Sequence, residues 1–166
     1  MTDPSANISI RPLEVDDLET LFAFQADPQS SHMAAFTAKN VTDRDAYMTK
    51  WHRLLADATV VSRTILLQES ANDPMIVGSV ATFLFGDERN VTYGVGRRYW
   101  GRGFATRGLQ LLLAEVHDRP LFARAASDNF GSIRVLQKCG FCEIGRDRFF
   151  AEARGRETEE TIFKLP

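Results

Sequence analysis

The stretch Arg98-Tyr99-Trp100-Gly101-Arg102-Gly103-Phe104-Ala105-Thr106 carries the clearest indication of fold and chemistry in this sequence. Residues 91–96, which follow a turn at Gly86-Asp87, are predicted to form a strand that leads into it. After it, apolar residues recur at helical spacing: Ala105, Leu109, Leu112, Leu113 and Val116. The stretch is therefore predicted to be a loop at which a strand ends and an amphipathic helix begins.

A loop of this kind is suited to bind an anion. The first N–H groups of a helix have no partner within the helix, and the helix dipole places positive charge there. Gly101 and Gly103 lack a Cβ, so the backbone can come close to a pyrophosphate, and Arg98 and Arg102 can add charge-assisted contacts. The spacing differs from Gly-x-Gly-x-x-Gly and from Gly-Lys-Ser/Thr, which disfavours a dinucleotide fold and a nucleotide P-loop.

The spacing Arg98-x-x-Gly101-x-Gly103 resembles the pyrophosphate loop of the GNAT superfamily of N-acetyltransferases. The longer run of residues 100–106 is similar to the version found in the ribosomal-protein N-terminal (alanine) acetyltransferase group. The run of residues 128–141, with its Asn129, Ser132 and Gly140-Phe141, is similar to that group as well. The resemblance extends over about two thirds of the chain.

The resemblance implies an α/β (α+β) fold: a mixed, mostly antiparallel twisted sheet of about six to seven strands with flanking helices. The strand before the loop is expected to splay from the strand at residues 121–126 and to open a cleft for acetyl-CoA, the cosubstrate. The backbone at Tyr93, Gly94 and Val95 and the side chain of Asn129 are expected to contact pantetheine. The pyrophosphate is expected to lie against the loop residues Arg98, Gly101, Arg102, Gly103, Ala105 and Thr106.

The implied reaction is direct attack of a primary amine on the thioester, and two catalytic roles have to be assigned. Ser132 is the candidate proton donor to the departing sulfur, with capping of a helix N-terminus as the alternative role. The base stays open. Asp87 and Glu88 are the acids at a suitable chain position but are more simply solvated turn residues, and Asn90 stands where relatives carry a Glu.

The remaining chain is predicted to complete a single domain, residues 1–166. A helix is expected from an N-cap at Asp16 to a break at Asp27-Pro28, a loop over residues 29–41, and a further helix capped by Thr42, with Trp51 on its apolar face. Strands are expected at residues 8–12, 60–67, 75–85 and 121–126, followed by a helix over 129–139 that ends at Gly140. Residues 142–149 and 161–165 are predicted to pair as a hairpin around a solvated, charged loop at 152–160.

Composition limits the function classes. A net charge of −2 gives no basic field for nucleic acid, and no apolar run or leader-like start predicts a membrane segment, so the expected location is cytoplasmic. The three histidines are scattered and predict no metal site. Cys139 and Cys142 are expected to be packing thiols, since the first precedes a helix C-terminus rather than an N-terminus. Trp100 either packs under the loop, which we favour, or covers the cofactor.

The leading hypothesis is an acetyl-CoA-dependent N-acetyltransferase that acts on a protein N-terminus or a small-molecule amine. A non-catalytic acyl-CoA-binding regulator is the alternative, motivated by the missing Glu at Asn90, and a nucleotide- or RNA-binding module is disfavoured by charge and motif. Acceptor specificity is expected from residues 29–41, the first two helices and the final hairpin. Terminal strands with an exposed edge allow a homodimer.

Overall fold

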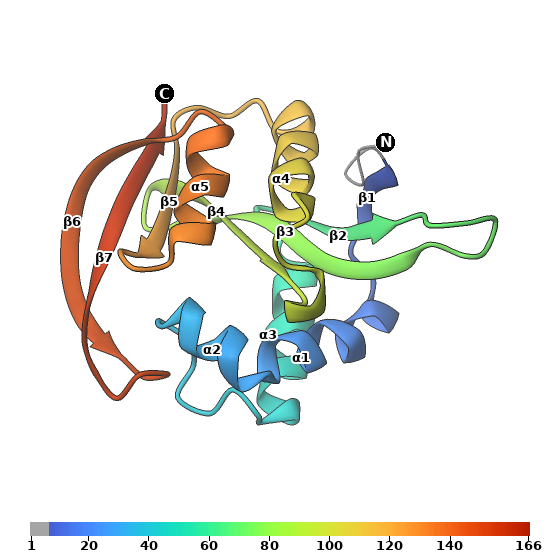
Figure 1. Cartoon of the computed structure of the whole chain (residues 1–166), viewed down its shortest axis with the longest axis horizontal. Helices are drawn as coiled ribbons and strands as arrows, with labels where there is room; N and C mark the ends of the chain where they lie inside the picture. Colours follow the sequence, from blue (N-terminus) through green and yellow to red (C-terminus); the bar gives the residue numbers. More distant parts are fainter. Residues whose placement is uncertain (1–6) are drawn as a thin grey trace.

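Seven strands form one sheet in the order β1-β2-β3-β4-β5-β7-β6 in the computed structural model, which describes residues 7–166 (Figure 1). Every neighbouring pair is antiparallel except β4 and β5, which are parallel. This confirms the mixed, mostly antiparallel sheet that was expected. The strands are β1 Ile8–Pro12, β2 Val61–Leu67, β3 Met75–Phe85, β4 Glu88–Val95, β5 Leu121–Ala126, β6 Cys142–Ala151 and β7 Arg156–Leu165.

The parallel pair comes apart almost as soon as it forms. Asn90 of β4 is in register with Phe122 of β5, and among the described residues this is the pairing that joins the two strands. Beyond it, β4 stays paired with β3 through Val95, while β5 stays paired with β7 through Ala126. The edge of β4 that faces β5 is thereby left without a strand partner, as expected for a splayed cleft.

Helices cover both faces of the sheet (Figure 1). One face carries α1 Leu18–Ala26, α2 Pro28–Ala34 and α3 Arg44–Ala56, and the other carries α4 Phe104–Glu115 and α5 Phe130–Lys138. Short 3-10 turns, η2 Val15–Asp17 and η3 Arg97–Tyr99, lead into α1 and into the loop before α4. No helix within residues 7–166 is long and apolar enough to cross a membrane.

The larger core lies between the sheet and the helices α4 and α5. Leu109 and Leu112 of α4 are fully buried against strand residues such as Ile65. The helix can come this close because position 108 is a glycine: a Cβ there would stand 2.5 Å from Cδ1 of Ile65. This close packing sets α4, and with it the loop at its N-terminus, against the middle of the sheet.

The expected loop over residues 29–41 is wrong in its first half, which is helix α2. The Asp27-Pro28 pair that was interpreted as a break is the start of this helix. Pro28 occupies the first helical turn, and the carboxylate of Asp27 accepts a hydrogen bond from the Ser30 N–H at 3.0 Å. Proline is well suited to a first helical position, so the same two residues end α1 and begin α2.

Two predicted N-caps are displaced by one residue. The predicted cap Asp16 is wrong, because Glu14 and Asp17 form a capping box around η2, and Asp17 itself precedes α1. The predicted cap Thr42 is also wrong: Asp43 accepts the Ala46 N–H at 3.0 Å and begins α3. Runs of adjacent polar residues offer several candidates for a cap, and spacing alone selected the wrong one in both places.

The predicted solvated loop at residues 152–160 is wrong in its second part, because β7 begins at Arg156 and includes residues 156–160. Only residues 152–155 form the turn, and Thr158 and Glu160 are buried. The charged side chains that led to the loop prediction form ion pairs across the hairpin. One such pair joins Arg146 and Glu159 at 2.8 Å. Strand β4 similarly begins at Glu88, three residues before the predicted start at residue 91.

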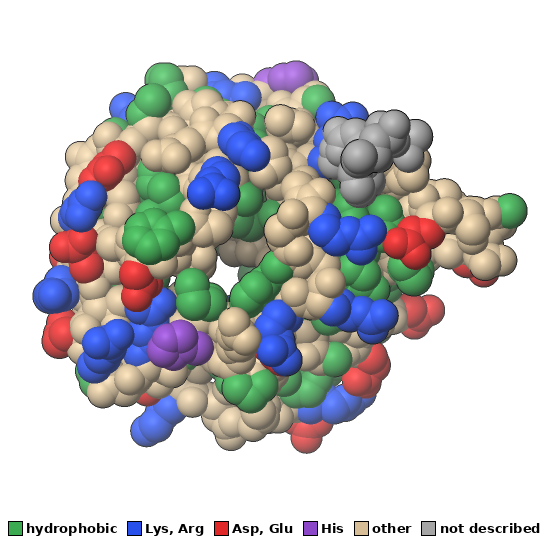
Figure 2. Space-filling model, in the orientation of Figure 1, with side chains coloured by type: hydrophobic (Ala, Val, Ile, Leu, Met, Phe, Trp, Pro, Cys, Tyr) green, Lys and Arg blue, Asp and Glu red, His purple; other side chains and the backbone are tan. Residues whose placement is uncertain are grey.

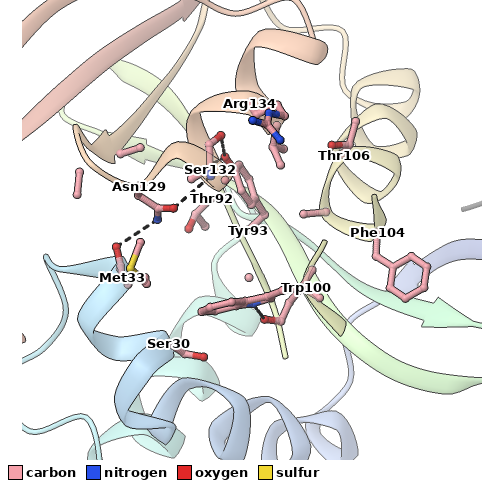
Figure 3. Close-up of a pocket in the computed structure, with 18 of the residues that line it drawn as sticks. Ser30, Met33, Thr92, Tyr93, Trp100, Phe104, Thr106, Asn129, Ser132 and Arg134 are labelled. Atoms are coloured by element: carbon pink, nitrogen blue, oxygen red, sulfur yellow. Dashed lines mark hydrogen bonds between the residues drawn. The ribbon is translucent and has the colours of Figure 1, made fainter. Parts of the chain in front are cut away.

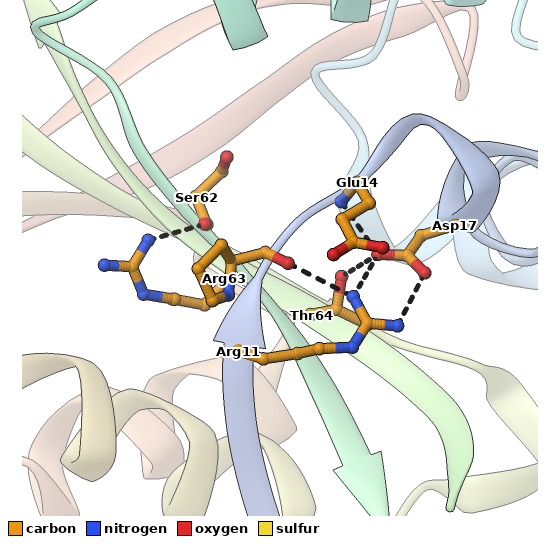
Figure 4. A network of polar contacts seen from close by, with 7 residues as sticks. Arg11, Glu14, Asp17, Ser62, Arg63 and Thr64 are labelled. Carbon is orange, nitrogen blue, oxygen red and sulfur yellow. Dashed lines mark hydrogen bonds and ion pairs between the residues drawn. The ribbon is translucent and has the colours of Figure 1, made fainter.

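An ion pair between half-buried Arg11 and buried Asp17 ties β1 to the start of α1 (Figure 4). Asp17, only 3% exposed, accepts two hydrogen bonds from Arg11 at 2.7 and 2.8 Å. It also accepts the Thr64 hydroxyl at 2.7 Å and the Glu14 N–H at 2.9 Å. Burial alone raises the pKa of this carboxyl, but the hydrogen bonds from Arg11, Glu14 and Thr64 outweigh it and lower the pKa to about 2.

Candidate functional site

A cavity of about 670 Å³ opens where β4 and β5 diverge. Its walls come from β4, the loop before α4, the first turn of α4, one face of α5, the end of β5 and α2. The space-filling view shows a hollow on this face with Lys and Arg side chains at its rim (Figure 2). The close-up shows side chains from β4, α2, α4 and α5 converging on it (Figure 3).

The loop before α4 has the backbone geometry of an anion site. Gly101 and Gly103 have φ angles of 74° and 79°, in the left-handed region that glycine adopts most readily. The first N–H to bond within the helix is that of Arg107, which donates to the Gly103 carbonyl at 3.0 Å. Within the described chain, the N–H groups of residues 104–106 have no such acceptor, and these residues line the cavity.

The basic side chains on the cavity wall are not those that the sequence indicated. Arg134 and Lys138, four residues apart on α5, line it, and so does Arg124 of β5. Arg98 and Arg102 do not. Arg102 pairs with Glu69 at 3.4 Å and covers the Phe104 ring. The helical spacing of Arg134 and Lys138 was readable in the sequence, but only knowledge of the fold shows that this face of α5 borders the cavity.

A hydrogen-bonded pair of hydroxyls joins β4 to α5 (Figure 3). Tyr93 Oη lies 2.7 Å from Ser132 Oγ and donates to the Ser132 carbonyl at 2.9 Å. Burial raises the pKa of the Tyr93 phenol, so the phenol keeps its proton over the physiological range. The sequence predicted a role in the site for the Tyr93 backbone only. Its side chain is in fact the partner of the candidate proton donor.

Asn129 holds the first turn of α5 in place. Its Oδ1 accepts the Ser132 N–H at 3.2 Å, and its Nδ2 donates to the Met33 carbonyl of α2 at 3.2 Å (Figure 3). The helix cap is thus Asn129, and the alternative role of Ser132 as the capping side chain is not what the structure has. The Ser132 hydroxyl does not cap the helix; it lines the cavity and forms a hydrogen bond with Tyr93.

Trp100 stands at the mouth of the cavity. Its side chain is 39% exposed, lines the cavity, and donates from Nε1 to the Val95 carbonyl at 2.8 Å (Figure 3). The favoured interpretation, packing under the loop, is therefore wrong. Tyr99, which is buried against Phe24 and Phe104, occupies that position instead.

Glu160 of β7 is the carboxylate on the cavity wall. It is 8% exposed, lies beside Ala126 in the β5–β7 pairing, and has Oε2 3.4 Å from Nη1 of Arg124. Burial raises the pKa of Glu160, Arg124 opposes that effect, and Asp147 of β6 adds to it. Glu160 was not predicted as a site residue, because the charged residues 152–160 are typical of a solvated loop.

The acids considered from the sequence lie elsewhere. Asp87 and Glu88 are exposed at the β3–β4 turn, as expected for solvated turn residues, and neither lines the cavity. Asn90 is 5% exposed at the point where β4 still pairs with β5, and its amide donates to the Glu88 carbonyl at 3.3 Å. Asn90 does not line the cavity either.

The two cysteines are not bonded to each other. Cys139 is half-buried with Sγ 3.7 Å from the Thr106 carbonyl, and burial raises the pKa of its thiol to about 11. Cys142 is exposed, and neither residue lines the cavity. Cys139 is therefore a packing thiol, as predicted, whereas the prediction is wrong for Cys142, which is exposed. No cluster of three or more metal-ligating side chains is found within residues 7–166.

Most of the residues predicted for the site come together around this one cavity. They are Tyr93, Gly94, Val95, Gly101, Gly103, Ala105, Thr106, Asn129 and Ser132. The two arginines of the loop are the predicted residues that lie off its wall. Arg124, Arg134, Lys138 and Glu160 line it without having been predicted.

A seven-stranded sheet that splits between two parallel strands, with a glycine loop and a helix N-terminus at the split, is the arrangement of an acetyltransferase of the GNAT type. Residues 7–142 match the model of the acetyltransferase (GNAT) domain, and the chain belongs to this family. It is 22% identical to p20 of Bacillus licheniformis, described as an uncharacterized N-acetyltransferase, with 95% of this chain and 92% of p20 covered.

Solved structures agree on the fold. Spermidine N-acetyltransferase from Vibrio cholerae, in complex with CoA and spermine, is similar with a TM-score of 0.81 at 15% identity, covering 96% of this chain and 95% of that one. Ribosomal-protein-alanine N-acetyltransferase from Brucella melitensis is similar with a TM-score of 0.76 at 19% identity, covering 95% and 98%.

Proposed function

We propose that this protein transfers an acetyl group from acetyl-CoA to a primary amine by direct attack in a ternary complex. The observation that carries the proposal is the anion-binding loop at the head of the β4–β5 cleft. Its left-handed glycines and unpaired helix N–H groups face the same cavity as the candidate proton donor. Similar proteins include acetyltransferases named for spermidine and for ribosomal-protein alanine, which supports an amine as the acceptor class.

The cavity fits acetyl-CoA in charge and shape. The N–H groups of residues 104–106 are suited to bind a pyrophosphate, and Arg134 and Lys138 supply positive charge along the same wall. The edge of β4 from Tyr93 to Val95 that faces away from β3 can pair with amide groups in the manner of an added strand, apart from the Val95 carbonyl, which accepts the Trp100 indole N–H. A volume of about 670 Å³ is within the range of cofactor pockets.

In this mechanism the amine nitrogen of the acceptor attacks the thioester carbonyl carbon. A C–N bond forms, the C–S bond breaks, and the sulfur leaves with the electron pair. A backbone N–H on the free edge of β4 polarises the carbonyl oxygen. One proton must leave the acceptor ammonium before attack, and one must reach the departing sulfur. The two thiols of the chain lie off the cavity wall, which favours direct transfer over an acetyl-enzyme.

Ser132 is the proposed proton donor to the sulfur. Its hydroxyl faces the cavity, and its Oγ lies 2.7 Å from Tyr93 Oη, so the phenol can hydrogen-bond to Oγ and stabilise the negative charge that develops there as Ser132 donates its proton to the sulfur. The raised pKa of Tyr93 keeps the phenol protonated, so it stays a hydrogen-bond donor. Tyr93 therefore positions Ser132 and is not itself the source of the proton.

Glu160 is the proposed base. It is a carboxylate on the wall of the cavity, and its burial raises its pKa toward the range in which a carboxylate accepts protons effectively. Arg124 at 3.4 Å fixes the carboxylate in place and limits the rise. The missing Glu at Asn90 thus does not leave the cavity without a carboxylate, which weakens the case for a non-catalytic regulator.

Thiol release from acetyl-CoA in the presence of a panel of amines and peptides tests the proposal. We expect amine-dependent thiol release, with intersecting initial-velocity lines that indicate a ternary complex. Binding of acetyl-CoA without turnover of any acceptor would support the acyl-CoA-binding regulator instead. The cytoplasmic location, the single domain over residues 1–166 and the homodimer stay predictions, and residues 1–6 lie outside the described part of the chain.

A further inference from the structure

A second cavity, of about 590 Å³, lies against the opposite face of β4. It is enclosed by α1, the segment from α2 to α3, α3 itself, and the face of β3 and β4 that these helices cover (Figure 1). We call it the acceptor chamber. The residues that line both cavities are Ser30, Ala34, Phe36, Thr92, Tyr93, Gly94 and Val95. The two spaces therefore meet across β4, beside the strand edge that would hold the thioester.

The wall of the chamber is aromatic. The large apolar and aromatic side chains come from α1, α3, the α2–α3 segment and β3, and they are Leu21, Phe24, Phe36, Tyr47, Trp51, Leu54 and Phe83. Tyr47 and Trp51 pack with ring centroids 6.2 Å apart. These rings leave a broad apolar surface facing the interior of the chamber.

Charge is nearly absent from the same wall. Asp43 and Lys50 are the charged residues that line the chamber, they have opposite sign, and both are exposed. The Asp43 carboxylate is already used, since its Oδ1 caps α3 through the Ala46 N–H at 3.0 Å. Among residues 7–166, the wall of the chamber therefore has no cluster of acids.

This composition selects among amines. A polyamine carries several ammonium groups, and each one that enters without an acidic partner loses its hydration uncompensated. A single ammonium next to the shared junction can lie over aromatic faces, and an aromatic body gains from leaving water. A chamber of this volume also suits a small molecule better than an extended peptide.

We infer that the acceptor is a small arylalkylamine: one primary amine on a short chain that ends in an aromatic ring. The inference rests on the proposed function, because the chamber is assigned to the acceptor by its junction with the acetyl-CoA cavity. The ring lies among Phe24, Trp51 and Phe83, and the amine points through the junction at Thr92 and Gly94.

Binding and turnover are measured separately so that the two proposals can fail separately. Phenethylamine, spermidine and a peptide with N-terminal alanine are titrated by calorimetry into protein saturated with CoA, which cannot react. We expect phenethylamine to bind at least about tenfold more tightly than the other two. Equal or tighter binding of spermidine or the peptide would overturn the arylalkylamine assignment, as would no binding of phenethylamine, whether or not any amine is acetylated.

The variant Phe83→Ala tests the location, with Phe85→Ala as its matched control. Both residues are on β3, but Phe83 lines the chamber while Phe85 is 65% exposed and does not. Phe83→Ala should weaken phenethylamine binding about tenfold and leave CoA affinity unchanged, since it removes one ring from the wall. Phe85→Ala should change neither. An equal effect of both variants on phenethylamine would place the amine outside the chamber.

Discussion

Tyr93 Oη lies 2.7 Å from Ser132 Oγ, so a hydroxyl of the cleft strand and a hydroxyl of helix α5 form one hydrogen-bonded unit on the wall of the cavity. The pairing connects the proposed proton donor to a buried phenol that stays protonated. Residues 39 positions apart in the sequence are brought together here by the splay of β4 from β5.

Removal of the Ser132 hydroxyl should slow the reaction without weakening the binding of acetyl-CoA. We expect Ser132→Ala to lower kcat by about 100-fold or more, because general acid catalysis is lost, with acetyl-CoA affinity within about twofold. Tyr93→Phe, which removes one oxygen from the pair, should lower kcat by a smaller factor. Steady-state rates and calorimetry on the same samples check this, and an unchanged kcat in Ser132→Ala would exclude the role.

Replacement of Glu160 should separate activity from stability. Its raised pKa means that the ionised carboxylate costs folding energy above that pKa, so Glu160→Gln should be as stable as the parent at neutral pH or more so. As the base must be ionised, the rate of the parent should fall as pH drops through the raised pKa. Glu160→Gln should lose most of its turnover, and its remaining rate should no longer fall as pH drops through that pKa. Retained turnover with the same fall in rate would contradict the assignment.

Backbone strain in the loop before α4 should weaken the binding of CoA. Gly101 has φ 74°, and no atom lies within 4 Å of a Cβ added there, so Gly101→Val is expected to fold but to shift the loop. We expect its affinity for CoA to fall at least about tenfold, since a left-handed non-glycine residue costs about 1–2 kcal/mol.

Gly86→Val is the matched control for this strain. Gly86 has φ 62°, with the same open space around an added Cβ, but it lies at the β3–β4 turn away from the cavity. Its variant should bind CoA normally. If both variants bind equally well by calorimetry, the loop is not the pyrophosphate site.

The two sets of basic residues make opposite predictions for CoA binding. Arg134 and Lys138 line the cavity, whereas Arg98 and Arg102 do not. The double variant Arg134→Gln/Lys138→Gln should weaken CoA binding by about fivefold to twentyfold, less so at high salt. Arg98→Gln/Arg102→Gln should weaken it by less than about threefold. The reverse order, measured at low salt, would favour the sequence-based assignment over the geometric one.

The Asp17 network should show in the acid stability of the fold (Figure 4). With a pKa of about 2 in the folded chain against an ordinary 3.8, Asp17 adds stability that is complete above about pH 4 and is lost toward pH 2. Asp17→Asn should reduce the free energy of unfolding by about 2–4 kcal/mol near neutral pH.

Asp16→Asn is the matched control, because Asp16 is the exposed neighbour and forms no such pair. Urea unfolding from pH 7 down to pH 2 should show the gap between parent and Asp17→Asn narrowing below pH 4. A gap that does not change with pH, or an equal loss in Asp16→Asn, would contradict the network's role.

Local patterns in the sequence predicted the parts of the fold that local physics decides. The bounds of β3 and β5, the end of α5 at Gly140 with φ 91°, and the loop between β4 and α4 all follow from residue types near them in the chain. The split sheet was expected from the resemblance, and it confirms the fold. The cavity then gathers most of the predicted residues because they belong to two motifs on either side of the split.

What the sequence could not predict depends on residues distant in the chain. Glu160 is charged and follows other charged residues in the sequence, so nothing local predicts that it is buried. It is buried because β7 lies between β5 and β6 in the sheet. The aromatic wall of the acceptor chamber combines residues from helices and strands that show no common period. Helix α2 was not predicted, because Asp27-Pro28 can both end one helix and begin the next.

The measurement that tests the central claim most directly is a calorimetric titration of the purified protein with acetyl-CoA, with ATP in parallel. Thiol release against the amine panel follows on the same sample. The account predicts binding of acetyl-CoA, no binding of ATP, and amine-dependent thiol release. A folded protein that binds no acetyl-CoA would contradict the account.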